Sequence, residues 1–182
     1  MLCLIPIGEV DPSVLDHLRV VLSRSFSLPC SLIKGVGVPS EAYNPRRKQY
    51  HSEVILHRLQ RYRPSQGERL LGVTEVDLYV PSLNFVFGQA DPAGGIALIS
   101  LCRLHQEYYG YPPDKALFLS RAAKEAVHEL GHTYGLRHCP HPKCVMHFSN
   151  SLSDTDIKNE SFCQRCQREL KGNLQRLRSL GR

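Results

Sequence analysis

The 182-residue sequence contains no apolar run long enough to cross a membrane. A spanning helix needs about 20 predominantly apolar residues, and every apolar stretch here is shorter. The apolar beginning, residues 1–8, has no basic segment before it and is interrupted by Pro6 and Gly8, unlike a signal peptide. We therefore expect no membrane partner and a cytoplasmic location.

Internal repeats and low-complexity linkers are also absent. The apolar fraction of 42% and the charged fraction of 22% are ordinary for a globular protein, and a chain of this length can bury a substantial core. We expect one compact catalytic unit that acts as a monomer. Residues 1–138 would form its larger part and residues 139–182 a small C-terminal lobe.

Acidic residues are scarce near the end of the sequence. Between residues 163 and 182 only Glu169 is acidic, whereas six side chains are basic. Such a segment could contact nucleic acid or an acidic partner, but a solvated helix face explains it more simply. Nucleic acid is therefore not an expected partner.

Apolar periodicity predicts strands that alternate with helices. The segments with the short apolar or alternating pattern of a strand are 2–8, 30–38, 69–80, 84–88 and 95–101. Helical spacing marks 12–26, 52–63, 115–134 and a terminal helix. Polar or turn-rich stretches at 41–49 and 89–94 predict loops. This order predicts an α/β (α+β) fold with a mixed, twisted sheet packed against helices.

The central motif is HELGH over residues 128–132, late in the predicted helix at 115–134. Residues four apart share one face of a helix, so the imidazoles of His128 and His132 can reach one metal ion. Glu129 lies about 100° around the helix from His128, where it can approach a metal-bound water without binding the metal. HExxH patterns also arise by chance, so this motif alone is moderately specific.

The motif continues with Gly135 and His138. An uninterrupted helix would carry residue 138 away from the metal, whereas glycine can adopt a positive φ that ends the helix and turns the chain back. His138 then supplies a third ligand and leaves a fourth position open for water, as in a catalytic zinc site. The complete spacing argues against accidental histidines on a structural helix.

A zinc ion at this site would acidify its bound water and polarise a substrate carbonyl. Glu129 would accept the proton of that water and later deliver it to the leaving amine. We expect hydrolysis of peptide bonds in a peptide or protein substrate. The alternative is a zinc-stabilised peptide- or protein-binding scaffold with little turnover, but such a scaffold has no need of Glu129.

Seven cysteines are an odd number for a disulfide framework, and four of them cluster. These four are Cys139, Cys144, Cys163 and Cys166. Their spacing suits one tetrahedral structural zinc, with two disulfides or a redox pair as the alternatives. His141 or His147 could replace one cysteine, although a surface position or a bond to a nearby carbonyl is the simpler role. We expect two zinc ions per chain, one catalytic and one structural, and mechanical coupling between them where Cys139 follows His138.

The pattern HExxHxxGxxHC, followed by four residues, Cys, one residue and Met, with a later CxxC, resembles the archaemetzincins, zinc peptidases of the metzincin clan. Segments 46–50 (RRKQY), 71–79 (LGVTEVDLY) and 84–88 (NFVFG) also resemble that family, so the resemblance covers most of the chain. It implies a zincin/metzincin-like fold with an active-site helix, an antiparallel edge strand along a substrate cleft, and a small zinc-stapled C-terminal lobe.

The resemblance also gives Met146 the place of the Met-turn methionine, an apolar floor beneath the catalytic zinc. Without it, a lone methionine is simply core filler. Many metzincins place a tyrosine near the zinc after this methionine, but no tyrosine follows Met146 here. Tyr134 is expected to pack away from the metal, which leaves no residue named for oxyanion stabilisation.

The type of peptidase follows less directly from the residues. Endopeptidase or exopeptidase action depends on the depth of the cleft and on a group that binds a substrate terminus. Arg46, Arg47 and Lys48 could bind a peptide carboxylate, but a solvated loop is the simpler role. We expect an aminopeptidase or an oligopeptidase.

Overall fold

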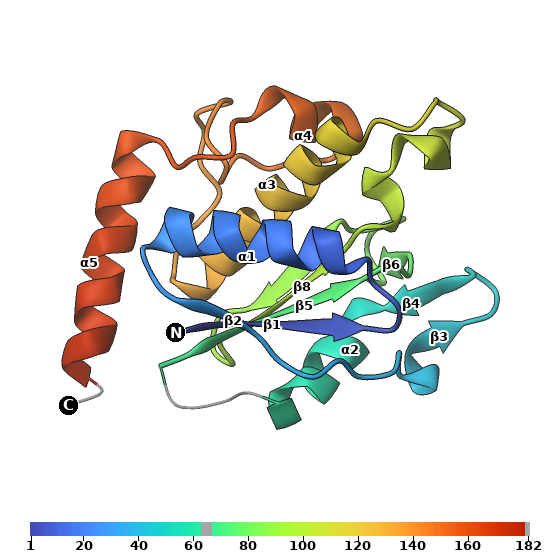
Figure 1. Cartoon of the computed structure of the whole chain (residues 1–182), viewed down its shortest axis with the longest axis horizontal. Coiled ribbons are helices and arrows are strands. Elements are labelled where there is room, and N and C mark those ends of the chain that lie inside the picture. Colours follow the sequence, from blue (N-terminus) through green and yellow to red (C-terminus); the bar gives the residue numbers. More distant parts are fainter. Residues whose placement is uncertain (63–66, 181–182) are drawn as a thin grey trace.

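The computed structural model describes residues 1–62 and 67–180. Its main sheet has the strand order β2-β1-β5-β8-β7. These strands are β1 (Leu2–Ile7), β2 (Cys30–Leu32), β5 (Arg69–Thr74), β7 (Gly88–Asp91) and β8 (Ile96–Ser100). The first four in the sheet run parallel, and β7 runs antiparallel to β8 at the edge. The predicted mixed sheet with an antiparallel edge strand is therefore confirmed (Figure 1).

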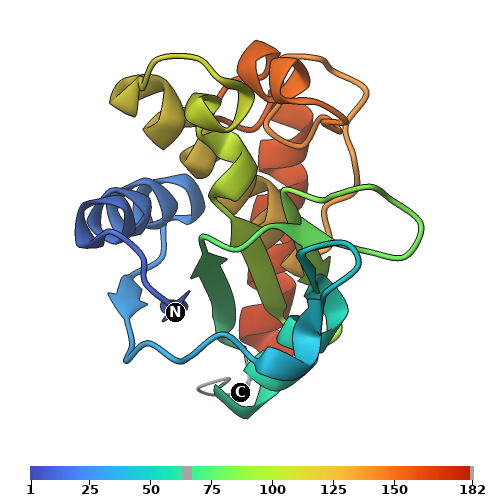
Figure 2. The ribbon, with the colours of Figure 1, turned by 90° about the vertical axis from the view of Figure 1, so that its right-hand side faces the viewer.

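Helices cover both faces of this sheet. One face carries α1 (Pro12–Phe26) and α3 (Lys115–Thr133), and the other carries α2 (Ser52–Leu59). Figure 2 shows the sheet between α1 and α2. Side chains alternate along a strand, so Leu2 and Leu4 of β1 join the core under α1 and α3, whereas Ile5 points to α2.

The C-terminal region packs on the α1 and α3 side (Figure 1). It contains α4 (Leu152–Ile157), which the sequence did not suggest, and α5 (Gln164–Leu180), the expected terminal helix. Its buried apolar residues, Met146 and Leu170 among them, belong to the same apolar cluster as those of α1 and α3. The region therefore shares one core with the rest, and the division between 1–138 and 139–182 stays a prediction.

The helix expected over 12–26 matches α1 at both ends, and the helix that carries the central motif lies close to its expected range. It was expected over 115–134, and α3 spans Lys115–Thr133. The Asp114 carboxylate accepts the backbone N–H of Leu117 at 2.9 Å, which satisfies a free donor of the first turn. The helix expected over 52–63 is shorter: α2 passes into the 3-10 turn Gln60–Tyr62, and residue 63 lies outside the described residues. No described helix is long and apolar enough to span a membrane.

The expected strand over 69–80 is two strands in two sheets. β5 ends at Thr74, and β6 (Leu78–Tyr79) joins a small sheet with β3 (Tyr43–Asn44) and β4 (Gln49–His51). Hydroxyl groups fix the backbone at the break, because Thr74 donates to the carbonyl of Ile7 (2.9 Å) and Ser100 donates to that of Val76 (2.7 Å). The expected loop over 41–49 accordingly contains β3 and the first residue of β4.

The expected strand over 30–38 ends early, at Leu32. Pro6 has no amide hydrogen to continue the ladder between β1 and β2, and the chain returns to β1 only through the bridge of Val36 to Ile7. The expected strand over 84–88 is displaced, because pairing with β8 begins at Gly88 and continues through the polar residues expected to form a turn. Pairing with a neighbour outweighs local propensity here. Short 3-10 turns at Ser40–Ala42, Cys102–Leu104 and Gln106–Tyr109 complete the chain.

Candidate active site

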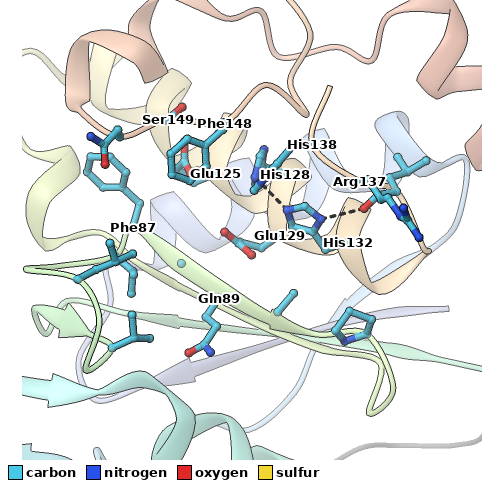
Figure 3. Close-up of a pocket in the computed structure, with 18 of the residues that line it drawn as sticks. Phe87, Gln89, Glu125, His128, Glu129, His132, Arg137, His138, Phe148 and Ser149 are labelled. Atoms are coloured by element: carbon cyan, nitrogen blue, oxygen red, sulfur yellow. Dashed lines mark hydrogen bonds between the residues drawn. The ribbon is translucent and has the colours of Figure 1, made fainter. Parts of the chain in front are cut away.

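The turn after α3 returns the chain toward the two histidines of the helix. Gly135 has a φ of +82°, in the left-handed region that favours glycine. The N–H of Leu136 donates to the carbonyl of Gly131 at 3.1 Å, which closes the turn. His138 thereby comes back beside the helix, as the spacing predicts (Figure 3).

Three imidazoles meet at one point. One ring nitrogen from each of His128, His132 and His138 lies within 4.8 Å of the others. The Nε2 atoms of His128 and His132 are 3.1 Å apart. Two nitrogens that bind one zinc ion at 2.0–2.1 Å in tetrahedral geometry are roughly 3.3 Å apart. The three side chains therefore fit a single zinc ion.

Backbone carbonyls orient two of the rings. Nδ1 of His128 donates to the carbonyl of Val145, and Nδ1 of His132 donates to that of Leu136, each at 2.8 Å. Because a carbonyl only accepts, Nδ1 carries the hydrogen and Nε2 keeps a lone pair for a metal. Burial lowers the pKa of both imidazoles, which favours the neutral form that binds metals.

Glu129 is buried beside the histidines and packs against β7. A Cβ added at Gly88 would lie 2.6 Å from Cγ of Glu129 and 2.7 Å from the carbonyl oxygen of Leu98, so glycine is needed for this approach. Burial, reinforced by the Glu125 carboxylate and opposed by Lys158, raises the pKa of Glu129 to about 8. A carboxyl with such a pKa can exchange a proton near neutral pH.

Met146 lies directly beneath the motif. It is fully buried, and a Cβ added at Gly131 would lie 2.5 Å from its sulfur. Its carbonyl accepts the N–H of Cys139 at 2.8 Å. The methionine is therefore packed against the helix turn that holds the histidines, and its role as the floor of a metal site stays a prediction.

A cleft of about 880 Å³ passes the histidines and Glu129. One wall is α3 with the turn after it, and the other is β7 with the loop before it. Much of the lining is apolar, with the aromatic rings of Phe85, Phe87 and Phe148. The cleft can therefore hold an extended chain beside the buried carboxylate.

The loop before β7 is fixed by side chains that the sequence did not single out for this role. The guanidinium of Arg47 and the amide of Gln49 both donate to the carbonyl of Asn84 at 2.9 Å. Arg103 lies 4.4 Å over the ring of Phe85. The expected solvated role is therefore wrong for Arg47, which braces the cleft wall. In the sequence, only the family resemblance of the RRKQY segment, residues 46–50, drew attention to this arginine.

Comparisons with known proteins agree with this geometry. Residues 8–172 match the model of "Peptidase family M54". The chain belongs to this family. An archaemetzincin from Pyrococcus furiosus is 47% identical, over 97% of this chain and 95% of its own length. The resemblance to archaemetzincins is confirmed, and membership of family M54 makes the chain a zinc metallopeptidase.

Solved structures show the same fold as this member of family M54. A zinc-dependent peptidase from Methanocorpusculum labreanum superposes with a TM-score of 0.87 at 32% identity, over 93% of this chain and 100% of its own. The archaemetzincin of Methanopyrus kandleri gives a TM-score of 0.84 at 40% identity, over 96% of this chain and 94% of its own. The predicted fold class is thereby confirmed.

A second cluster in this M54 peptidase consists of cysteines. All seven cysteines lie in the described part of the chain and are free thiols. The ligand atoms of Cys139, Cys144, Cys163 and Cys166 lie within 4.8 Å of one another, with 3.8 Å between the sulfurs of Cys139 and Cys163. Two sulfurs on one zinc at 2.3 Å in tetrahedral geometry are roughly 3.8 Å apart. The four thiols therefore fit one tetrahedral ion.

The two histidines near this cluster have other partners. His147 Nδ1 lies 2.8 Å from the carbonyl of Cys139, and the exposed His141 accepts the N–H of Lys143 at 3.2 Å. Neither belongs to the group of four thiols. Tyr134 packs in the core, with its ring centroid 5.3 Å from that of Phe26.

Proposed function

We propose that the chain hydrolyses peptide bonds in this cleft through a metzincin-type site. His128, His132 and His138 would hold a catalytic zinc, and Glu129 would act as the base. The main support is that two imidazoles, each oriented by a carbonyl, present Nε2 atoms 3.1 Å apart beside a buried carboxylate in one cleft.

A bound zinc ion supplies a Lewis acid that acidifies water and polarises a substrate carbonyl. Glu129 accepts the proton of the attacking water and then donates it to the nitrogen of the leaving amine. Burial raises the pKa of Glu129, which makes its carboxylate a stronger proton acceptor than an exposed one. Gly88 leaves room for this side chain against β7.

The edge of β7 offers a place for the substrate backbone. β7 pairs with β8 on one side only, and its residues line the cleft. An extended peptide can add to such an edge by main-chain hydrogen bonds. An aminopeptidase or an oligopeptidase can use this arrangement, and the substrate is a peptide or protein in either case.

Cys139, Cys144, Cys163 and Cys166 would hold a second, structural zinc, which gives two ions per chain. Four protein ligands leave no open position, so this ion would contribute to stability and not to hydrolysis. Gly135 would support the catalytic site by returning His138 to it, and Met146 by forming its apolar floor. The cytoplasmic location and the monomeric state remain predictions.

A mixed peptide library incubated with the zinc-loaded wild type and with Glu129→Ala tests the proposal. Mass spectrometry should find products that require both zinc and Glu129, while metal analysis should find two zinc ions in both proteins. Products that persist in Glu129→Ala would remove this residue from the mechanism. If neither protein gives zinc-dependent products, the zinc-stabilised binding scaffold is the better description.

A further inference from the structure

A second carboxylate, Glu125, lines the cleft one helical turn before Glu129. Its Oε1 accepts the hydroxyl of Thr155 at 3.1 Å and lies 3.0 Å from Nζ of Lys158. The side chains of Glu125 and Lys158 are 4% and 0% exposed, and only Glu125 lines the cleft. Both of these contacts are made by Oε1, and Glu125 is among the residues that line the cleft.

Stability alone does not account for this ion pair. The free energy needed to remove two charges from water is about as large as the free energy gained from their attraction. A buried ion pair therefore often stabilises a fold no more than an apolar pair of similar volume. Neither side chain belongs to the histidine or the cysteine cluster. The pair is, however, a dipole with its ammonium buried and its carboxylate at the cleft, which makes this part of the wall electronegative.

Two neighbours in the cleft complete a site for a cation. The hydroxyl oxygen of Ser149 is buried and has no partner among the described residues, and the ring of Phe148 is half exposed. In Figure 3, Glu125, Phe148 and Ser149 lie on one side of the three histidines, and Arg137 lies on the other. A carboxylate gives an ammonium or guanidinium a strong hydrogen bond, and an aromatic face attracts it.

We propose that Glu125, Phe148 and Ser149 form a subsite that binds a lysine or arginine side chain of the substrate next to the cleaved bond. The cationic head donates to Oε2 of Glu125 and to the Ser149 hydroxyl, and the methylene stem packs on Phe148. Lys158 and Thr155 hold the carboxylate by its other oxygen. This proposal rests on the proposed function, because the subsite belongs to the same cleft.

The ratio of the kcat/KM values for two matched substrates tests the subsite. A peptide from the library is made with lysine, or with uncharged norleucine, beside the cleaved bond. The wild type should have about a tenfold higher kcat/KM for the lysine peptide, the size of one hydrogen bond to a charged group. In Glu125→Gln the ratio should fall toward 1. Arg137→Gln, a cleft residue of opposite charge, is the matched control and should keep the wild-type ratio.

Glu125→Gln leaves Lys158 buried without a counter-ion and can fail to fold. The double variant Glu125→Gln/Lys158→Met removes both charges and keeps similar volumes. Its zinc content and thermal midpoint establish folding, and its lysine-to-norleucine ratio should also fall toward 1. A wild-type ratio in this folded variant would overturn the subsite.

A binding measurement separates this proposal from the proposed function. Zinc-loaded Glu129→Gln is titrated calorimetrically with the same two peptides, and the lysine peptide should bind about tenfold more tightly. If the wild type cleaves no peptide but this preference persists, hydrolysis fails and the subsite stands. If cleavage occurs and neither binding nor turnover prefers lysine, the subsite fails and hydrolysis stands.

Discussion

The histidine cluster and the cysteine cluster adjoin each other in the chain but differ in their surroundings. The histidines lie along the cleft, and backbone carbonyls hold two of their rings. Three of the four thiols are buried, and none lines the cleft. Three neutral ligands at an open cleft suit a reacting metal, whereas four enclosed thiols suit a permanent one. The two proposed roles are therefore separated by whether the cleft reaches the cluster, more than by the spacing of the ligands in the sequence.

The largest expected effect comes from removing zinc in two steps. A mild chelator should first take the ion from the histidine site, which opens onto the cleft, with complete loss of hydrolysis and little change in the thermal midpoint. Added zinc should restore activity. Metal analysis should still find one ion per chain at the point of full inactivation. Loss of both ions together would mean that the two clusters do not differ in access.

Replacing a cysteine ligand should produce the next largest effect. In Cys163→Ser one zinc is lost, and the free energy of unfolding should fall by several kcal/mol, because binding of a structural metal contributes directly to folding. Hydrolysis should fall as well, since Cys139 adjoins His138. Cys102→Ser, at a cysteine outside the cluster, is the control. Urea unfolding and the kinetics of hydrolysis are measured for both variants. Full activity in Cys163→Ser would refute the coupling of the two sites.

Gly131→Ala tests the contact between the motif and its floor. The added methyl would meet the sulfur of Met146 at 2.5 Å, so we expect a loss of about 1–3 kcal/mol in stability from overpacking. Gly172→Ala is the matched control, because a Cβ there meets nothing within 4 Å and alanine favours the helix by about 0.5–1 kcal/mol. Equal thermal midpoints for the two variants would contradict the close contact.

The smallest expected effect concerns the link between the clusters. His147 bonds the carbonyl of Cys139, so His147→Ala should cost about 1 kcal/mol of stability. Both zinc ions should stay bound, because His147 is not among the four thiol-bearing ligands. A loss of one zinc ion in this variant would instead give His147 a ligand role.

The sequence predicted the features that depend on local spacing. His128 and His132 share a helix face, and Gly135 turns the chain back, so their meeting with His138 follows from local helix and turn geometry. Features that depend on distant pairing were missed. The strand breaks after Thr74, where the Thr74 hydroxyl donates a hydrogen bond to the carbonyl of Ile7, and no local sequence pattern predicts this contact.

The surroundings of the candidate site were predicted less well for the same reason. Arg47 braces a loop 37 positions away in the sequence, and Glu125 pairs with Lys158 from a later segment. A basic residue in a polar loop and a glutamate on a helix are ordinary local patterns. Only the fold brings their partners to them.

The order of the cysteines along the chain has a consequence for synthesis. Cys139 and Cys144 leave the ribosome before Cys163 and Cys166, and a tetrahedral ion needs all four. A nascent chain that already displays His128, His132 and His138 therefore still lacks the second ion that would hold His138 in place. With the proposed pair of zinc ions, a competent peptidase would form only after the start of α5, which carries Cys166, has been synthesised.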